Sequence, residues 1–169
     1  FADSFTLKVR HHNEQLHARN APVEPTARAC YDAVETVRYE ALGANAYQGM
    51  RDNLDAALMV RVGGDPITRA VRADEVPMSA ALSLLLRERL TGQPVPEAAR
   101  AGVDMLRGWI DERAGGDFDA LAASIDDQKA FQSLALNMLQ HLELTKAEPM
   151  EPSTEEGEEQ DGEDQSEDQ

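Results

Sequence analysis

Residues 118–145 read FDALAASIDDQKAFQSLALNMLQHLELT and form the most regular stretch of the chain. At 100° per residue, the apolar side chains of this stretch fall within an arc of roughly 160°. They are Phe118, Leu121, Ile125, Phe131, Ala135, Met138, Leu139 and Leu142. The polar side chains on the opposite side are Asp119, Asp126, Ser133, Asn137 and His141. This separation predicts one long amphipathic helix that packs against a core, and it favours an all-α fold.

Similar apolar spacings predict further helices upstream, at about 26–43, 46–61, 78–91 and 96–114. Between them stand turn and helix-ending signals, which are Gly43, Gly63–Pro66, Gly92 with Pro94, and Gly115-Gly116. Asp117 is then a suitable N-cap for the helix that begins at 118. Residues 67–76 show no clear period and are expected to lie over the surface. The sequence therefore predicts a multi-helix orthogonal bundle.

The beginning of the chain leaves two structures open. In SFTLKVRHH, residues 4–12, the apolar Phe5, Leu7 and Val9 alternate with polar residues. A period of two is typical of a half-buried strand. The run is short, however, and a helix is also compatible with it. Prolines at 22 and 25 separate this region from the helix that follows.

The charge distribution divides the chain into two predicted parts. The whole chain has a net charge of −16. Residues 148–169 contain 11 acidic residues and no Lys or Arg, so −11 of that charge belongs to them and −5 to residues 1–147. A segment with such repulsion and one apolar side chain, Met150, is predicted to be disordered. We therefore expect a helical domain over 1–147 and a disordered acidic linker over 148–169.

The same charge excludes some classes of partner. Nucleic acid requires a basic face that neutralises phosphates, and anionic membranes attract polybasic segments. No apolar run approaches the ~20 residues that cross a bilayer. Cys30 is the only cysteine, so no internal disulfide can form, which fits a reducing cytoplasm. Its position within a helical pattern favours a buried core residue over a reactive thiol.

The histidines are the first candidates for chemistry. His11, His12 and His17 lie close together in sequence, and Glu14 with His17 forms an E-x-x-H pair. In di-iron bundles such a pair provides two ligands, but a second pair and further carboxylates complete the site. His141 is preceded by Met138 at the corresponding position, so no second pair exists. We expect solvated or locally hydrogen-bonded histidines and assign no metal ligand.

The chain also lacks a complete catalytic set. Adjacent carboxylates occur at Asp74-Glu75, Asp111-Glu112 and Asp126-Asp127. Neighbours on a helix point about 100° apart, so a solvated, salt-bridged surface explains these pairs better than acid–base catalysis does. Neither phosphate-binding glycine motifs nor a nucleophile motif is present. We therefore predict no catalytic, cofactor-binding or metal site in this chain.

Several motifs stand in order between residues 16 and 131. They are LHAR at 16–19 with Ala21-Pro22, ARACYDAVE at 27–35 followed by Arg38 and Glu40–Gly43, Gly49 with Asn53-Leu54, RERLTG at 87–92 followed by Pro94 and Pro96, WIDERAG at 109–115 and IDDQKAF at 125–131. This ordered set resembles the N-terminal region of the T subunit of the aerobic cobaltochelatase, the CobT family. An acidic linker follows the motifs in that family too.

The resemblance implies a place in a large complex. That complex inserts cobalt into hydrogenobyrinic acid a,c-diamide during cobalamin biosynthesis, with ATP hydrolysis. A large subunit holds the corrin ring, an AAA+ subunit hydrolyses ATP, and the T subunit couples the two, in assemblies that include rings. ATP, magnesium and cobalt would then be bound by other subunits or by the C-terminal von Willebrand A domain of T subunits. The D-x-S-x-S motif of that domain is not found in these residues, so we expect it to be absent from this chain.

Two other readings remain open. A stand-alone acidic adaptor or chaperone would use its tail to bind basic partners. A metal-binding bundle enzyme would rest on Glu14 and His17 alone.

Overall fold

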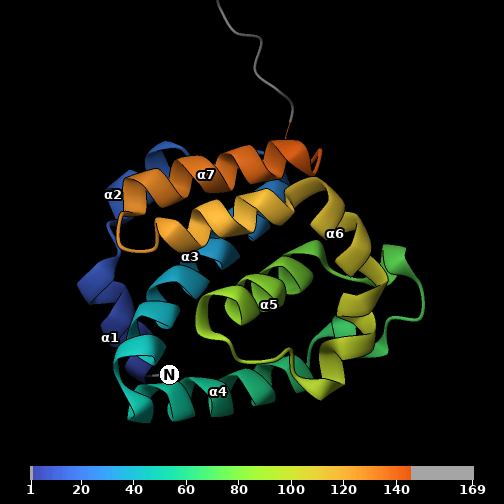
Figure 1. The fold of residues 1–169 in the computed structure, drawn as a ribbon, viewed down its shortest axis with the longest axis horizontal. Helices are drawn as coiled ribbons and strands as arrows, with labels where there is room; N and C mark the ends of the chain where they lie inside the picture. Colours follow the sequence, from blue (N-terminus) through green and yellow to red (C-terminus); the bar gives the residue numbers. More distant parts are fainter. Residues whose placement is uncertain (1, 146–169) are drawn as a thin grey trace, which may run out of the picture.

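The computed structural model describes residues 2–145, and all regular structure in this part of the chain is helical. The α-helices are α1 (Ala2–His11), α2 (Glu14–Arg19), α3 (Pro25–Ala46), α4 (Gln48–Gly63), α5 (Met78–Thr91), α6 (Glu97–Ala123) and α7 (Gln128–His141). Two short 3-10 helices, η1 (Pro66–Arg69) and η2 (Ala73–Glu75), connect α4 to α5. The predicted all-α fold is confirmed (Figure 1).

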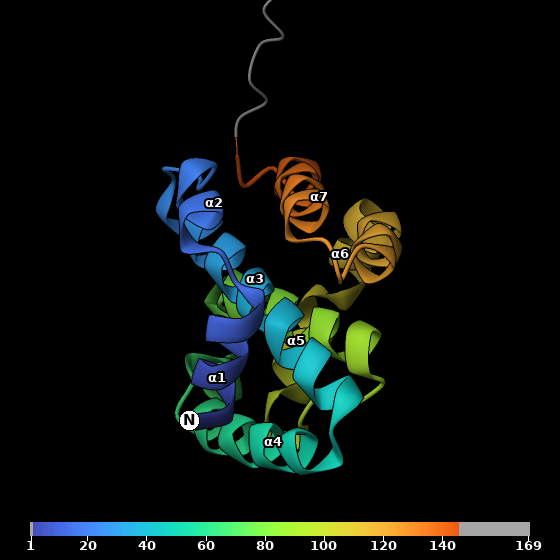
Figure 2. The same ribbon diagram turned by 90° about the vertical axis from the view of Figure 1, so that its left-hand side faces the viewer.

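Helix α3 is the central element, and α1, α4, α5 and α7 all pack against it (Figure 2). The apolar side chains of α3 that recur at helical spacing are buried; they are Cys30, Val34, Val37 and Ala41. Helix α3 continues past the predicted end at Gly43, which instead serves as a packing site. A Cβ at Gly43 would collide with the Leu7 side chain of α1, so the missing side chain lets the two helices approach closely.

Of the two structures left open for the beginning of the chain, the helix is confirmed and the strand is wrong, because residues 2–11 form helix α1. Leu7 is buried, whereas Phe5 and Val9 remain 65% and 69% exposed. A strand leaves its backbone groups unpaired unless another strand lies beside it, and the described residues contain no strand. A helix satisfies those groups internally. Only one apolar residue of the alternating run is therefore needed to fix it to α3.

The predicted break at Gly115-Gly116 is also wrong, because α6 runs without interruption from Glu97 to Ala123. Each glycine in a helix interior costs about 1 kcal/mol relative to alanine. Burial outweighs that cost, since apolar side chains on both sides of the glycines face the core. They are Ile110, Ala114, Phe118 and Leu121. Asp117 lies within the helix and caps nothing.

The single helix predicted over 118–145 is in fact two. Helix α6 ends at Ala123, and α7 begins at Gln128 with Asp127 as its N-cap. The Asp127 side chain accepts a hydrogen bond from the Ala130 amide, 3.1 Å away. Helices α6 and α7 pack side by side (Figure 1). The predicted apolar face still holds, because its members other than Ile125 are buried.

The segment between α4 and α5 has a larger part in the core than expected. The residues of η2 and the two ends of η1 are exposed, yet Ile67 within η1 and Val76 directly after η2 are buried among the residues of the main apolar cluster. Each of these residues anchors one short helix. The segment therefore crosses the surface while closing one side of the core.

Some sequence predictions lie outside the described residues. Disorder over 148–169 and the domain boundary at 147 both stay predictions. Among residues 2–145, none of the helices combines the length and the hydropathy that a membrane span requires.

Candidate functional site

A cluster of polar side chains lies inside the molecule where α1, α2 and α3 meet the α6–α7 turn. The buried polar residues His17, Glu35 and Arg38 belong to it. The side chain of His12, in the linker between α1 and α2, is 4% exposed. Buried polar groups are costly unless they are hydrogen-bonded, so the partners of each residue decide what this cluster can do.

The centre of the cluster is the ion pair of Glu35 and Arg38, one turn apart on α3. Arg38 Nε donates to both Glu35 oxygens, at 2.9 and 3.0 Å, and Nη2 donates to Oε1 at 2.7 Å. The remaining donors reach backbone carbonyls, with Nη2 on His11 at 2.6 Å and Nη1 on Ile125 at 3.1 Å. One guanidinium thereby ties α3 to the end of α1 and to the α6–α7 turn.

His12 bridges two carboxylates. Its Nδ1 lies 3.0 Å from Glu35 Oε1, and its Nε2 lies 2.9 Å from Glu14 Oε2. Glu35 belongs to α3 and Glu14 begins α2, so this one ring joins the linker to both helices.

His17 is held by two residues of α3. Its Nε2 lies 2.7 Å from Asp32 Oδ1, and its ring stacks on Tyr31 at a centroid distance of 4.3 Å. The Tyr31 hydroxyl donates to the His17 carbonyl at 2.7 Å. Burial, together with the nearby Glu35 and Asp32 charges, raises the pKa of Tyr31, so the phenol stays protonated and remains a donor.

These groups border an open polar cavity of about 250 Å³ between the α1–α2 segment and α3. Its wall includes Lys8, Glu14, Thr36 and Tyr39 in addition to the histidines and their carboxylate partners. The side chains of this wall can form hydrogen bonds and ion pairs.

The predicted E-x-x-H pair does not converge on one point. Both residues are on α2, but Glu14 binds His12 while His17 binds Asp32. No group of three or more potential metal ligands occurs in the described part of the chain. His12 and His17 are hydrogen-bonded, as one of the two expected states, but both are buried, and their partners on α3 lie 23 and 15 positions away in sequence.

The other two histidines lie outside this cluster. His141 Nδ1 lies 2.7 Å from Asp117 Oδ2, which joins α7 to α6. Burial, with help from Arg10 and Arg38, lowers the pKa of His11.

The carboxylate pairs behave as a polar surface. Asp74 and Glu75 both form ion pairs with Arg72. The carboxylates of the other two pairs are exposed; they are Asp111, Glu112, Asp126 and Asp127. The residues of segment 87–89 form ion pairs with neighbouring helices. Arg87 binds Asp55 of α4, while Glu88 and Arg89 bind Arg107 and Asp119 of α6. Cys30 is fully buried, and burial raises the pKa of its thiol to about 12.

Sequence reasoning missed the Glu35–Arg38 pair and the position of His12. A signal for the pair was available, because Glu35 and Arg38 directly follow Val34 and Val37 on the buried face of α3. Charges at i and i+3 within an apolar arc indicate a buried pair. His12 had no such signal, since its partners are set by how α1 and α2 return to α3.

Comparison with known proteins agrees with the motifs. The family described as "Cobalamin biosynthesis protein CobT" matches residues 1–169. No solved structure matches this chain. Two motif residues quoted above, Glu35 and Arg38, lie in the buried cluster, and a third, Asp32, lies half-exposed at its edge. With a match over the full length, the chain belongs to the CobT family of cobalamin biosynthesis proteins.

Proposed function

We propose that this chain is a non-catalytic coupling module of the ATP-dependent aerobic cobaltochelatase. In this role, residues 1–147 dock on the AAA+ subunit and transmit its motion toward the large corrin-binding subunit. Cobalt is the metal that the complex inserts into hydrogenobyrinic acid a,c-diamide, and ATP is hydrolysed by the AAA+ partner. Membership of the CobT family supports the pathway, and the structure supports the mechanical role.

The observation that carries the proposal is where the motif residues direct their side chains. Arg38 donates hydrogen bonds to the Glu35 carboxylate and to the carbonyls of His11 and Ile125. Asp32 accepts from His17 and Arg28. These contacts join α1, α2, α3 and the α6–α7 turn into one body, which is what a module that transmits force requires.

The RERLTG motif at 87–92 supports the same role near the C-terminal end of α3, where the Asn45 side chain donates to the Leu90 carbonyl. Arg87 and Glu88 bind Asp55 and Arg107 at 2.7 and 3.2 Å, and so link α5 to α4 and α6. Gly92 ends α5 in the left-handed region, with φ at 74°, where glycine is favoured. The motif thereby fixes three helices relative to one another.

Residues 148–169 would act as a tether in this scheme. A flexible chain of this length spans about 25 Å in root-mean-square terms, and self-repulsion extends it further. Such a tether raises the effective concentration of whatever it carries near the docked module.

Analytical ultracentrifugation with the cognate AAA+ subunit tests docking. We expect co-sedimentation of the 169-residue chain. A matched variant, with every Asp and Glu of 148–169 changed to Asn or Gln, should co-sediment equally well, because docking is assigned to the helical domain. Failure of the chain to co-sediment, under conditions where a longer T subunit does so, would contradict the proposal.

The 169-residue chain and its variant with a neutralised 148–169 segment also test the alternative of a stand-alone acidic adaptor. The composition of residues 148–169 favours binding to basic proteins. That reading predicts salt-sensitive binding to histones, lost in the neutralised variant, and no binding to the AAA+ subunit.

A further inference from the structure

His12 has an unusual set of hydrogen-bond partners. A neutral imidazole has one N–H donor and one acceptor nitrogen, whereas an ionised carboxylate only accepts. Here Nδ1 faces Glu35 Oε1 at 3.0 Å and Nε2 faces Glu14 Oε2 at 2.9 Å. If both carboxylates are ionised, both ring nitrogens must carry a proton. The protonation state of His12 then follows from geometry.

Glu35 is ionised in this arrangement. Its two oxygens accept three contacts from the Arg38 guanidinium, which has no proton to lose in this pH range. A protonated Glu35 would place a hydrogen against these donors. Nδ1 of His12 must therefore donate.

Glu14 is ionised as well. Its side chain is 64% exposed, and water stabilises the carboxylate. Nε2 must therefore donate too, and the ring that fits this site is the imidazolium.

We propose that His12 is a proton-dependent clamp, which in its doubly protonated form holds the first turn of α2 to α3 and which releases Glu14 when one proton is lost. The device regulates how firmly the α1–α2 segment closes over the polar cavity. It acts beside the proposed docking function and does not depend on it.

The released partner is Glu14 because the two carboxylates are held differently. Arg38 fixes Glu35 in place, so a neutral His12 keeps its remaining N–H on Nδ1. The Nε2 lone pair would then face the Glu14 carboxylate, and two acceptors repel. Glu14 is exposed and begins a helix of six residues, so it can turn toward water at small cost.

The other charged and titratable groups around His12 come from three helices. On α1, Lys8 lines the same cavity, and its carbonyl accepts from the His12 amide. On α2, the His17 ring lies 5.0 Å from the His12 ring, centroid to centroid. On α3, Asp32, Arg38 and Tyr39 complete the surroundings. His17 needs one N–H for its bond to Asp32, so the clamp requires no second imidazolium beside the first.

Residue-resolved imidazole ¹⁵N NMR on the 169-residue chain tests the protonation state directly. Between pH 5.5 and 8.5, which brackets ordinary histidine titration, we expect both ring nitrogens of His12 to be protonated at the acidic end. A single N–H on His12 at pH 5.5 would overturn the proposal.

Hydrogen exchange tests the release. The Leu16 and His17 amides bond to Asn13 in the first turn of α2, and their protection factors should fall roughly tenfold as His12 loses its proton. The Phe131 amide at the start of α7 provides an internal reference that should not change.

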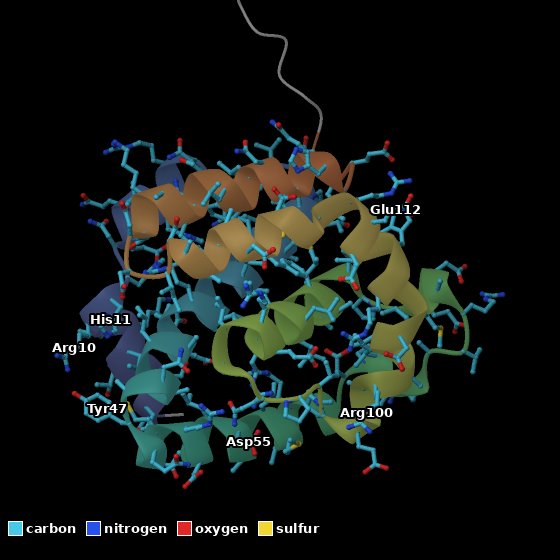
Figure 3. All side chains as sticks on the ribbon, viewed as in Figure 1. Arg10, His11, Tyr47, Asp55, Arg100 and Glu112 are labelled. Carbon is cyan, nitrogen blue, oxygen red and sulfur yellow. The ribbon has the colours of Figure 1, made fainter. Side chains whose placement is uncertain are left out.

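Glu14→Gln distinguishes the clamp from general loosening at high pH. An amide can accept from the imidazolium and donate to the neutral ring, so this variant should retain the contact in both states. We expect the tenfold change to shrink below about twofold. Glu112→Gln makes the same charge change on the far side of the molecule from His11 and should behave as wild type (Figure 3). A wild-type pH profile in Glu14→Gln would overturn the proposal.

Discussion

Gly102 of α6 packs directly against Ile67 of η1, and a Cβ at Gly102 would stand 2.8 Å from the Ile67 carbonyl oxygen. This contact lets a short 3-10 helix close one side of the core. It also explains why Ile67 is buried in a segment that shows no helical period in sequence.

Gly102→Ala should therefore destabilise the fold. The added methyl group meets backbone, which cannot rotate away, and overpacking of this kind costs about 1–3 kcal/mol. Gly108→Ala, six residues later in the same helix, meets nothing within 4 Å and should gain up to about 1 kcal/mol from helix propensity. Urea unfolding of both variants measures the difference. Equal effects would show that the Ile67 contact does not limit packing.

Arg38→Met should lower the stability of the fold much more than Arg28→Met does. It leaves the Glu35 carboxylate buried beside His12 and removes the donors for the His11 and Ile125 carbonyls. Loss of one partner of a buried pair costs about 3–5 kcal/mol. Arg28→Met breaks an exposed pair with Asp32, where about 1 kcal/mol or less is expected. Similar unfolding midpoints for the two variants would contradict the central role of Arg38.

The helical class was predictable from sequence because apolar spacing reports which face of a segment is buried. It does not report whether that segment is continuous. Phe118 and Phe131 share a predicted face, yet a turn at Ser124–Asp127 lies between them, because α6 and α7 both direct apolar faces inward. The glycines at 115 and 116 misled in the opposite direction, since burial of Ala114 and Phe118 outweighs their low helix propensity.

The polar cluster was harder to predict for a physical reason. Glu35 and Arg38 are neighbours on one helix, so their pairing is local and was accessible in principle. His12 meets Glu35 across 23 positions, and Arg38 meets the Ile125 carbonyl across 87. Those contacts depend on how the helices return to one another, which a periodic pattern does not encode.

The turn between α6 and α7 makes a prediction of its own. Asp127→Ala removes the side chain that accepts from the Ala130 amide at the start of α7. Loss of such an N-cap costs about 1 kcal/mol, whereas Asp126→Ala removes an exposed neighbour that does not cap α7 and should cost little. Thermal unfolding compares the two. In one continuous helix neither substitution would remove a cap, so destabilisation confined to Asp127→Ala supports the turn.

Cys30 should be inert in the folded chain. The thiolate is the reactive form, and burial raises the pKa of this thiol to about 12. With a disulfide reagent at pH 8, we expect labelling at least about a hundredfold slower than in urea-unfolded chain, because both access and thiolate fraction are reduced. Labelling at the unfolded rate without denaturant would contradict the burial of this residue.

The same shift gives a pH dependence with a defined sign. The unfolded chain releases the Cys30 proton near the ordinary value of 9.0, whereas the folded chain retains it up to about 12. Below pH 9 the thiol contributes its full share to stability. Above it, the free energy of unfolding falls by up to about 1.4 kcal/mol per pH unit because of this group.

Urea unfolding at pH 8, 9 and 10 measures this slope of unfolding free energy against pH for wild type and for Cys30→Ala. The alanine variant starts from a lower stability but should lose the Cys30 part of the slope, while the part from Tyr31, whose pKa burial also raises, stays in both. Parallel slopes would show that the thiol ionises equally easily in the folded and unfolded states.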